Sequence, residues 1–289
     1  MNTSVVADVS AITGKAPIWD DRRDVVWWVD IQSQRLLATD SFGLTESIST
    51  PSQPGMIALA QSGALILGLE DGLWLYSPEA ARWAQIAQVE ADRPTVRLND
   101  GKVDGFGRLW FGSMDMTGTG QAIGRLYCRL PSGEISVVRE GIKTPNAIVP
   151  SQDGVGIWFT DSPTRVVQFA AFEGEGSVSL DWKTIVELPS GMTPDGACED
   201  GQGRLWLSTV GQGQVICLGR DGSVHSIHQL PTSRLTMTAF GGKDLDRLFV
   251  TTQRRFLGAD QLAAEPAAGG LICLHPGAVG TAARRIPDL

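Results

Sequence analysis

One short pattern recurs along the chain and constrains the possible folds more than any other feature. A Gly or Asp turn leads into an apolar run, often with a Trp, and a second turn and a second apolar run follow. The central apolar runs are residues 26–30, 64–68, 108–112, 156–160, 204–208 and 247–251. Their spacing of roughly 40 to 48 residues is the period expected when one four-stranded blade is repeated around an axis. The sequence therefore predicts an all-β chain that forms a single six-bladed β-propeller domain over residues 1–289.

The main alternative for an all-β chain, a pair of β-sandwiches, explains six evenly spaced copies less well. A propeller ring that stays open exposes sheet edges. We therefore expect residues 5–9 to pair with the last blade and close the ring. No long stretch has a helical period, and the short Ala-rich candidates for helices are residues 78–87 and 260–264.

Composition and charge exclude several classes of function. Apolar residues make up 42% of the chain and charged residues 19%, which is enough for a large core. The net charge of −8 argues against a nucleic-acid partner, because neutralising phosphates requires a basic face. No apolar run reaches the about 18 residues of a membrane span, and residues 1–14 lack the pattern of a secretory signal. We expect a cytoplasmic protein that acts on a small molecule, binds neither nucleic acid nor membrane, and is a monomer or a weak homo-oligomer.

Cysteine and histidine usage argues against a zinc site or a Ser-His-Asp triad. The four cysteines are widely spaced and include no Cys-x-x-Cys pair, so they are expected to be structural thiols. The three histidines, His225, His228 and His275, occur late in the chain and include no His-x-x-x-His pair. Any metal would have to be held mainly by oxygen ligands.

Polar side chains gather just before the third central run. Residues 97–104 contain Arg97, Asn99 and Lys102 together with two aspartates and a glycine. A structural turn needs the glycine and one capping side chain, but it does not need this whole set. Because loops on a rigid scaffold commonly carry binding groups, the segment predicts a pocket for a small hydroxyl-rich or anionic molecule.

Equivalent polar residues precede other central runs. They are Lys15, Asn99, Asn146, Asp195 and Thr236. In a propeller the loops that enter the innermost strands converge at one end, so these residues are expected to meet. Pro145-Asn146 and Pro194-Asp195 occupy the same place in successive repeats, and proline stiffens the entry to each strand. This placement favours a site over ordinary turns for Asn146 and Asp195.

These segments resemble the senescence-marker-protein/gluconolactonase family of regucalcin-like six-bladed propellers over nearly the whole chain. The matching motifs are residues 97–104, 107–114, 17–19, 28–31, 194–196 and 240–242. The segment 251–271 is most similar to the bacterial sugar-acid lactonases of that family. The resemblance implies a hydrolase that opens sugar lactones and binds one divalent cation (Ca, Zn, Mn or Fe) through a Glu, an Asn and an Asp.

Carried over residue by residue, the resemblance makes Asn146 and Asp195 metal ligands. Arg97 and Asn99 match residues that contact the substrate, and we add Lys102 to this binding group. A further substrate-contacting carboxylate of some family members is replaced here by Thr117.

The first expected metal ligand is missing. The family reads Gly-Glu-Gly-Pro where this chain reads Gly14-Lys15-Ala16-Pro17, so Lys15 stands in place of the glutamate. A protonated lysine offers donors only and cannot ligate a cation. Three outcomes are open: the ammonium replaces the cation beside Asp195, burial deprotonates Lys15 into a base or nucleophile, or a weaker metal site persists on Asn146 and Asp195.

The sequence thus predicts a lactonase-type hydrolase with Asp195 as the base and either a metal or Lys15 as the electrophile. One alternative keeps the pocket but has Lys15 serve an isomerase or lyase reaction on a sugar-acid derivative. The other alternative is a propeller that binds a ligand without catalysis.

Overall fold

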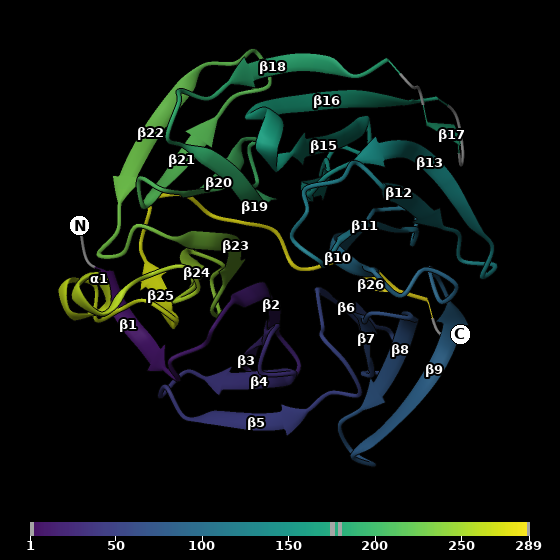
Figure 1. Cartoon of the computed structure of the whole chain (residues 1–289), viewed down its shortest axis with the longest axis horizontal. Coiled ribbons are helices and arrows are strands. Elements are labelled where there is room, and N and C mark those ends of the chain that lie inside the picture. Colours follow the sequence, from purple (N-terminus) through teal and green to yellow (C-terminus); the bar gives the residue numbers. More distant parts are fainter. Residues whose placement is uncertain (1–2, 174–176, 179–180, 288–289) are drawn as a thin grey trace. The chain divides into compact units, whose positions relative to one another are not determined.

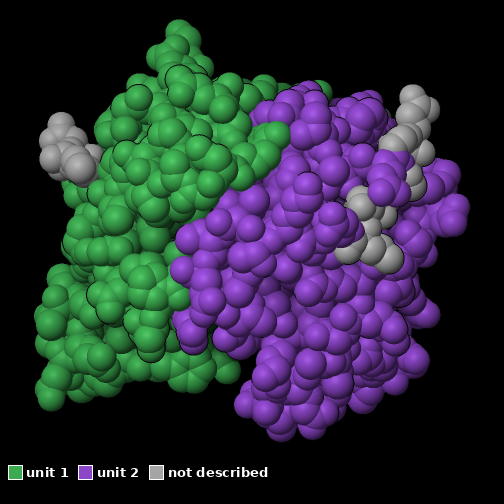
Figure 2. All heavy atoms as spheres, turned by 90° about the horizontal axis from the view of Figure 1, so that it is seen from above, with its two compact units in different colours: residues 1–50, 188–282 green, residues 51–187, 283–289 purple. Residues whose placement is uncertain are grey.

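The computed structural model describes residues 3–173, 177–178 and 181–287, and nearly all of their regular secondary structure is β-strand. The chain divides into two compact units, one of residues 1–50 and 188–282 and the other of residues 51–187 and 283–289. Figure 2 colours the first unit green and the second purple. Within the described part of the chain, no helix is long and apolar enough to cross a membrane.

The first unit contains three antiparallel sheets among the described residues (Figure 1). The first sheet has β2 (Gly14–Asp20), β3 (Val25–Asp30), β4 (Arg35–Asp40) and β5 (Thr45–Ser49). The second has β19 (Thr193–Glu199), β20 (Leu205–Val210), β21 (Gln214–Leu218) and β22 (Val224–Gln229). The third has β23 (Leu235–Gly241), β24 (Arg247–Thr252), β25 (Gly270–Leu274) and β1 (Thr3–Asp8), with helix α1 (Ala259–Ala264) between β24 and β25.

The second unit also contains three sheets in its described residues (Figure 1). One has β6 (Met56–Ala60), β7 (Leu65–Gly68), β8 (Gly72–Ser77) and β9 (Arg82–Gln88), and β26 (Arg285–Ile286) adds parallel to β6. The next has β10 (Val96–Val103), β11 (Leu109–Asp115), β12 (Gly124–Arg129) and β13 (Ile135–Ile142). The last has β14 (Pro145–Pro150), β15 (Gly156–Asp161), β16 (Val166–Glu173), β17 (Ser177–Val178) and β18 (Lys183–Glu187), with the 3-10 helix η1 (Ser162–Thr164) after β15.

The predicted central runs are the second strands of these sheets, namely β3, β7, β11, β15, β20 and β24. The predicted pairing of the chain start with the last sheet is also confirmed, because Val5 lies opposite Ile272 where β1 pairs with β25. The strand β1 thereby covers the edge that β25 would otherwise expose.

One helix candidate was wrong and the other right. Residues 260–264 fall in α1, whereas residues 78–87 form a turn and most of β9. In that hairpin Trp83 lies opposite Tyr76, and their ring centroids are 4.6 Å apart. Cross-strand aromatic packing of this kind outweighs the modest helix propensity of the alanines.

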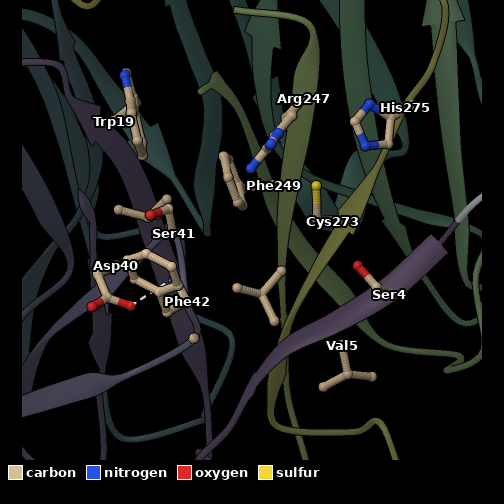
Figure 3. Close-up of a pocket in the computed structure, with 13 residues that line it drawn as sticks. Ser4, Val5, Trp19, Asp40, Ser41, Phe42, Arg247, Phe249, Cys273 and His275 are labelled. Atoms are coloured by element: carbon tan, nitrogen blue, oxygen red, sulfur yellow. Dashed lines mark hydrogen bonds between the residues drawn. The ribbon is translucent and has the colours of Figure 1, made fainter. Parts of the chain in front are cut away.

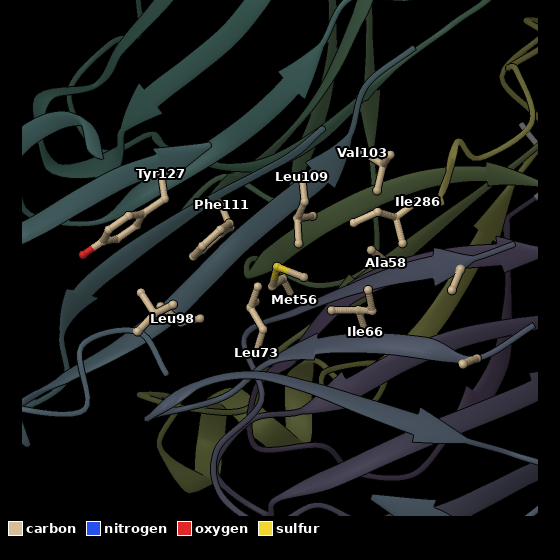
Figure 4. Close-up of a cluster of buried hydrophobic side chains, with 13 residues drawn as sticks. Met56, Ala58, Ile66, Leu73, Leu98, Val103, Leu109, Phe111, Tyr127 and Ile286 are labelled. Atoms are coloured by element: carbon tan, nitrogen blue, oxygen red, sulfur yellow. The ribbon is translucent and has the colours of Figure 1, made fainter. Parts of the chain in front are cut away.

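Tryptophans of the second strands anchor the cores. Trp28, Trp110, Trp158 and Trp206 are among the largest fully buried side chains. Figure 4 shows the cluster between the sheets of β6 and β10, in which Met56, Leu98 and Phe111 pack together. The four cysteines are buried as well, and burial raises the pKa of the Cys128 thiol to about 12, as expected of structural thiols.

Candidate functional site

The first strands of four sheets carry the predicted site residues, and each of these strands has a shift in its pairing register at or next to such a residue. The pairing register shifts after Lys15 in β2, Asn99 in β10, Asn146 in β14 and Pro194 in β19. A β-bulge of this kind re-aims a side chain and is common next to active sites. The residues that follow Lys15, Asn99 and Asn146 also have positive φ, which is a strained conformation for a residue other than glycine.

In the first unit the structure brings Lys15, Asp195 and Thr236 together. The Lys15 ammonium forms an ion pair with Oδ1 of Asp195 and donates a hydrogen bond to the Thr236 carbonyl oxygen at 3.1 Å. The exposed fraction of the side chain is 3% for Lys15 and 17% for Asp195. The Thr236 hydroxyl donates to the Gly14 carbonyl oxygen at 2.5 Å, which holds β23 beside β2. Residues far apart in sequence thus form one polar cluster, as predicted.

The Lys15–Asp195 pair is not expected to add much to the free energy of unfolding. Removing two opposite charges from water costs several kcal/mol per ion, and a well-packed apolar pair is often as stable or more stable. A part-buried ion pair at a β-bulge is therefore a candidate for a chemical role. The pair offers a proton acceptor and a fixed positive charge side by side.

The same pair tests whether the implied divalent cation fits this chain. The one carboxylate among the predicted ligands, Asp195, already accepts from the Lys15 ammonium, which has no lone pair to offer a metal. Two unit charges 4 Å apart interact by about 4 kcal/mol at an effective dielectric of about 20, and a divalent ion doubles the repulsion. The residues around Asp195 do not fit a cation. Asn146 belongs to the other unit, so its pairing with Asp195 as a ligand stays a prediction.

In the second unit the structure brings Arg97, Asn99 and Asn146 together. Arg97 Nη1 donates to Asn99 Oδ1 at 3.0 Å, and Asn99 Nδ2 donates to Asn146 Oδ1 at 3.3 Å and to the Pro145 carbonyl oxygen at 2.9 Å. Asn146 Nδ2 donates to Ser162 Oγ at 2.8 Å. All three predicted side chains are buried. Asn99 and Asn146 are neutral, and only Arg97 carries a charge. The group therefore suits the binding of hydroxyl groups rather than proton transfer.

Two other polar residues of the 97–104 segment have different outcomes. Lys102 is half-buried and lies opposite Trp110 in the β10–β11 pairing, and its substrate-binding role stays a prediction. Asp104 is structural, because its Oδ2 accepts from Arg108 Nε at 2.6 Å and from Trp110 Nε1 at 2.8 Å.

The Asp104 arrangement recurs in the first unit. Asp200 Oδ2 accepts from Arg204 Nε at 2.7 Å and from Trp206 Nε1 at 2.9 Å. The shared sequence is Asp-Gly-x-Gly-Arg-Leu-Trp, found at residues 104–110 and 200–206. Its glycines and aspartate shape the turn between the first and second strands, and we call it the Asp-Arg-Trp corner.

The sequence analysis missed Arg234, which directly precedes β23. Its Nε and Nη2 lie 3.1 and 3.2 Å from the side-chain amide of Gln253, whose oxygen accepts both hydrogen bonds. Burial lowers the pKa of Arg234, while the charges of Asp195 and Glu265 act in the opposite direction. The signal available in the sequence was that Arg234 lies two residues before Thr236, a predicted site residue, and alternate residues of a strand point to the same face.

A separate cavity of about 370 Å³ lies in the first unit, between β1, β25 and the turn after β4. Figure 3 shows Arg247 and His275 on one side, Asp40 and Phe42 on another, and Phe249 between them. Asp40 stabilises the turn that follows β4, because its Oδ1 accepts from the Phe42 and Leu44 amides, both at 2.9 Å. None of the predicted site residues is among the described residues that line this cavity.

The fold and the polar cluster define the class of protein. The structure superposes on that of a calcium-binding regucalcin from Agrobacterium tumefaciens str. C58 with a TM-score of 0.93, at 24% identity, over 99% of this chain and 97% of that one. The chain is therefore a six-bladed β-propeller, as predicted. Residues 13–254 match the model of the SMP-30/Gluconolactonase/LRE-like region, and the chain belongs to that family.

Two relatives show the range of the family. The chain is 30% identical over 266 residues to the 6-deoxy-6-sulfogluconolactonase of Pseudomonas putida, which covers 90% of this chain and 89% of the relative. It is 31% identical over 291 residues to the L-arabinolactonase of Azospirillum brasilense, covering 98% of this chain and 94% of the relative.

Proposed function

We propose that this protein is a hydrolase that opens a small sugar lactone. The observation that carries the proposal is the buried Lys15–Asp195 ion pair, placed at the bulges of β2 and β19 in a chain of this family. The relatives named as lactonases support the reaction class. Lactone opening needs a group that polarises the ring carbonyl and a base that activates water, and the pair supplies one of each.

In the proposed mechanism the Asp195 carboxylate takes a proton from a water molecule. The water oxygen forms a bond to the carbonyl carbon of the lactone, and the Lys15 ammonium stabilises the negative charge that develops on the carbonyl oxygen. The bond between that carbon and the ring oxygen then breaks. The ring oxygen receives the proton from Asp195, and the product is the open sugar acid. The step consumes one water molecule and leaves both side chains in their starting states.

The second unit contributes binding groups to this proposal. Arg97 and Asn99 are proposed to hold substrate hydroxyl or carboxyl oxygens, and Lys102 is proposed to assist them. Their support is the hydrogen-bonded chain that fixes Arg97 against Asn99, because a fixed donor loses little freedom on binding.

The divalent cation of the calcium-binding relative has no part in the mechanism proposed here. Lys15 occupies the carboxylate that a cation would need, and we propose that its ammonium is the electrophile instead. Asn146 then serves as a hydrogen-bonding residue. The cytoplasmic location and the monomeric or weakly associated state remain predictions.

The lyase and Schiff-base alternatives require the Lys15 nitrogen to act as a base or a nucleophile. In the structure this nitrogen is held between the Asp195 carboxylate and the Thr236 carbonyl oxygen, so the geometry favours an electrostatic role in hydrolysis over those reactions. A propeller that binds without catalysis would have no need of a base beside the ammonium.

The test is lactone opening followed as acid release, with chelator-treated protein and a panel of five- and six-membered aldonolactones. Turnover above the uncatalysed rate is expected for at least one lactone. No turnover of any lactone, together with saturable binding, would favour the non-catalytic alternative. Reductive trapping of a lysine adduct with borohydride would favour the Schiff-base alternative.

A further inference from the structure

A second set of cations lies in the same unit as the Lys15–Asp195 pair. Arg234 directly precedes β23, and Thr236, two residues later, provides the carbonyl oxygen that accepts from Lys15. The Arg234 guanidinium is held by Gln253, which pairs with Thr13, two residues before Lys15. Arg234 therefore lies beside the strand that carries Lys15, where it can influence what binds there.

The loop after β24 adds a second guanidinium to the set. The backbone amides of Arg254 and Arg255 both donate to the Ile12 carbonyl oxygen, at 3.0 and 2.9 Å, which fixes the loop against the segment before β2. Phe256 follows with φ of 67°, which is uncommon and strained for a bulky residue. The loop thus holds Phe256 in an energetically unfavourable backbone conformation.

Phe256 is 71% exposed, and its ring contacts both guanidiniums. The Arg255 guanidinium carbon lies 4.7 Å from the ring centroid and that of Arg234 lies 5.4 Å from it. Cation–π attraction to a shared ring offsets part of the repulsion between the two arginines. The arrangement holds two like charges near one another at a solvent-accessible edge.

The carboxylates near these arginines are already engaged by other donors. Glu265 Oε2 accepts from Thr232 Oγ1 at 2.9 Å and from the Ser233 amide at 2.7 Å, and Asp195 accepts from Lys15. The cluster has three cations, Lys15, Arg234 and Arg255, and two carboxylates, Asp195 and Glu265. A bound anion would balance the charge, and a guanidinium fork matches a carboxylate in geometry.

We propose that the site prefers a lactone with a terminal carboxylate, the monolactone of a sugar diacid, and that Arg234 and Arg255 bind this carboxylate. This inference rests on the proposed lactonase function and names its substrate class. Arg234 is the stronger determinant because it is half-buried and held by Gln253, whereas Arg255 is exposed.

The experiment compares kcat/KM for a neutral aldonolactone and for the matching lactone with a terminal carboxylate. In the wild type, kcat/KM for the carboxylate substrate is expected to be at least tenfold higher. Arg234→Gln is expected to lower this ratio roughly ten- to hundredfold, with the neutral substrate changed less than about threefold. Arg255→Gln should lower the ratio by about threefold.

The matched control is Arg247→Gln, which removes the same charge at the opposite end of the β23–β24 hairpin. It is expected to leave the ratio unchanged. Equal preference for the two lactones in the wild type overturns the inference while leaving lactone hydrolysis intact. An equal loss for both lactones in Arg234→Gln also overturns it.

Binding separates this inference from the proposed function. If neither lactone is opened, calorimetric titration with the open-chain sugar diacid and with the corresponding monoacid still tests Arg234. Tighter binding of the diacid that Arg234→Gln abolishes supports the anion site. Equal affinity for the two acids overturns the anion site.

Discussion

Strands β2 and β14 have similar local backbone geometry but carry different chemical groups. Lys15 in β2 and Asn146 in β14 are both buried, both lie where the register shifts, and both precede an alanine with positive φ. Lys15 faces a carboxylate, whereas Asn146 accepts from an amide and donates to a hydroxyl. The bulge fixes where a side chain points, and the residue type at the bulge decides what the site can do. One substitution within a constant backbone can therefore exchange an oxygen ligand for a cation.

The two polar clusters also differ in what a mutation should do. In the first unit, charge sits on both partners, so changing either one leaves an uncompensated charge. In the second unit, the amides Asn99 and Asn146 are neutral, and their loss should affect substrate affinity more than the chemical step.

The sharpest contrast is between Asp195→Asn and Asn146→Ala. Because the first removes the base and the second removes a neutral hydrogen-bonding group, Asp195→Asn is expected to lower kcat by about 10²- to 10⁴-fold. Asn146→Ala should mainly raise KM. Circular dichroism should confirm that both variants are folded. Near wild-type kcat in Asp195→Asn would remove Asp195 from the mechanism and erase the contrast.

The Asp-Arg-Trp corners test a place where the two units are alike. Asp104→Ala leaves the Arg108 side chain, which is 2% exposed, without its carboxylate, and we expect a loss of about 3–5 kcal/mol in unfolding free energy. Asp200→Ala should cost less, about 1–3 kcal/mol, since the Arg204 side chain is 24% exposed and retains water. Denaturant unfolding of both variants measures the difference. Equal losses would show that burial of the arginine is not what sets the cost.

Lys15→Glu should convert the charge pattern of the first cluster into a cation site. Two adjacent carboxylates repel each other and favour a divalent ion bound through oxygen ligands. Wild-type turnover should change less than about twofold on chelation, whereas turnover of Lys15→Glu should rise at least about tenfold with added divalent metal. Lys15→Met serves as the control that loses the ammonium without gaining a ligand. Strong inhibition of the wild type by chelator would contradict a metal-free centre.

The smallest effect concerns pH. All three histidines belong to the first unit, and burial lowers the pKa of His228 from its ordinary value of 6.5. The unfolded chain therefore takes up this proton first, and stability should fall as pH decreases through about 6.5. The midpoint of thermal unfolding should drop by a few degrees between pH 7.5 and 5.5, and less in His228→Gln. The exposed His225→Gln is the control and should behave as the wild type.

The sequence was sufficient for the six second strands because each is a continuous apolar run bounded by turn residues. Asn146 and Asp195 could be proposed as site residues because a proline precedes each at the same point of the repeat. Of the five residues predicted to meet, the contacts confirm this for Lys15, Asp195 and Thr236.

Other features could not be extracted from the sequence in the same way. Asp104 fell within the segment 97–104 that was predicted to form a pocket, because an aspartate near an arginine and a tryptophan is equally suited to a pocket and to a buried corner. Its second copy at Asp200 was the evidence for the corner. Arg234 stood in no motif, and its importance depends on Gln253 and Phe256, which approach it only through the loop after β24.

The pairing of β1 with β25 has a consequence for how the chain is made. A ribosome releases β1 first and β25 near the end, so the partner edge of β1 does not exist during most of translation. The five described sheets that precede β23 can form from neighbouring segments of the nascent chain, but β1 must wait for β25, which is synthesised near the end. Such non-local pairing is slow, and an unpaired strand is prone to aggregate in the meantime. The yield of native protein in cells should therefore depend on what shields the emerging N-terminal segment until the last sheet is complete.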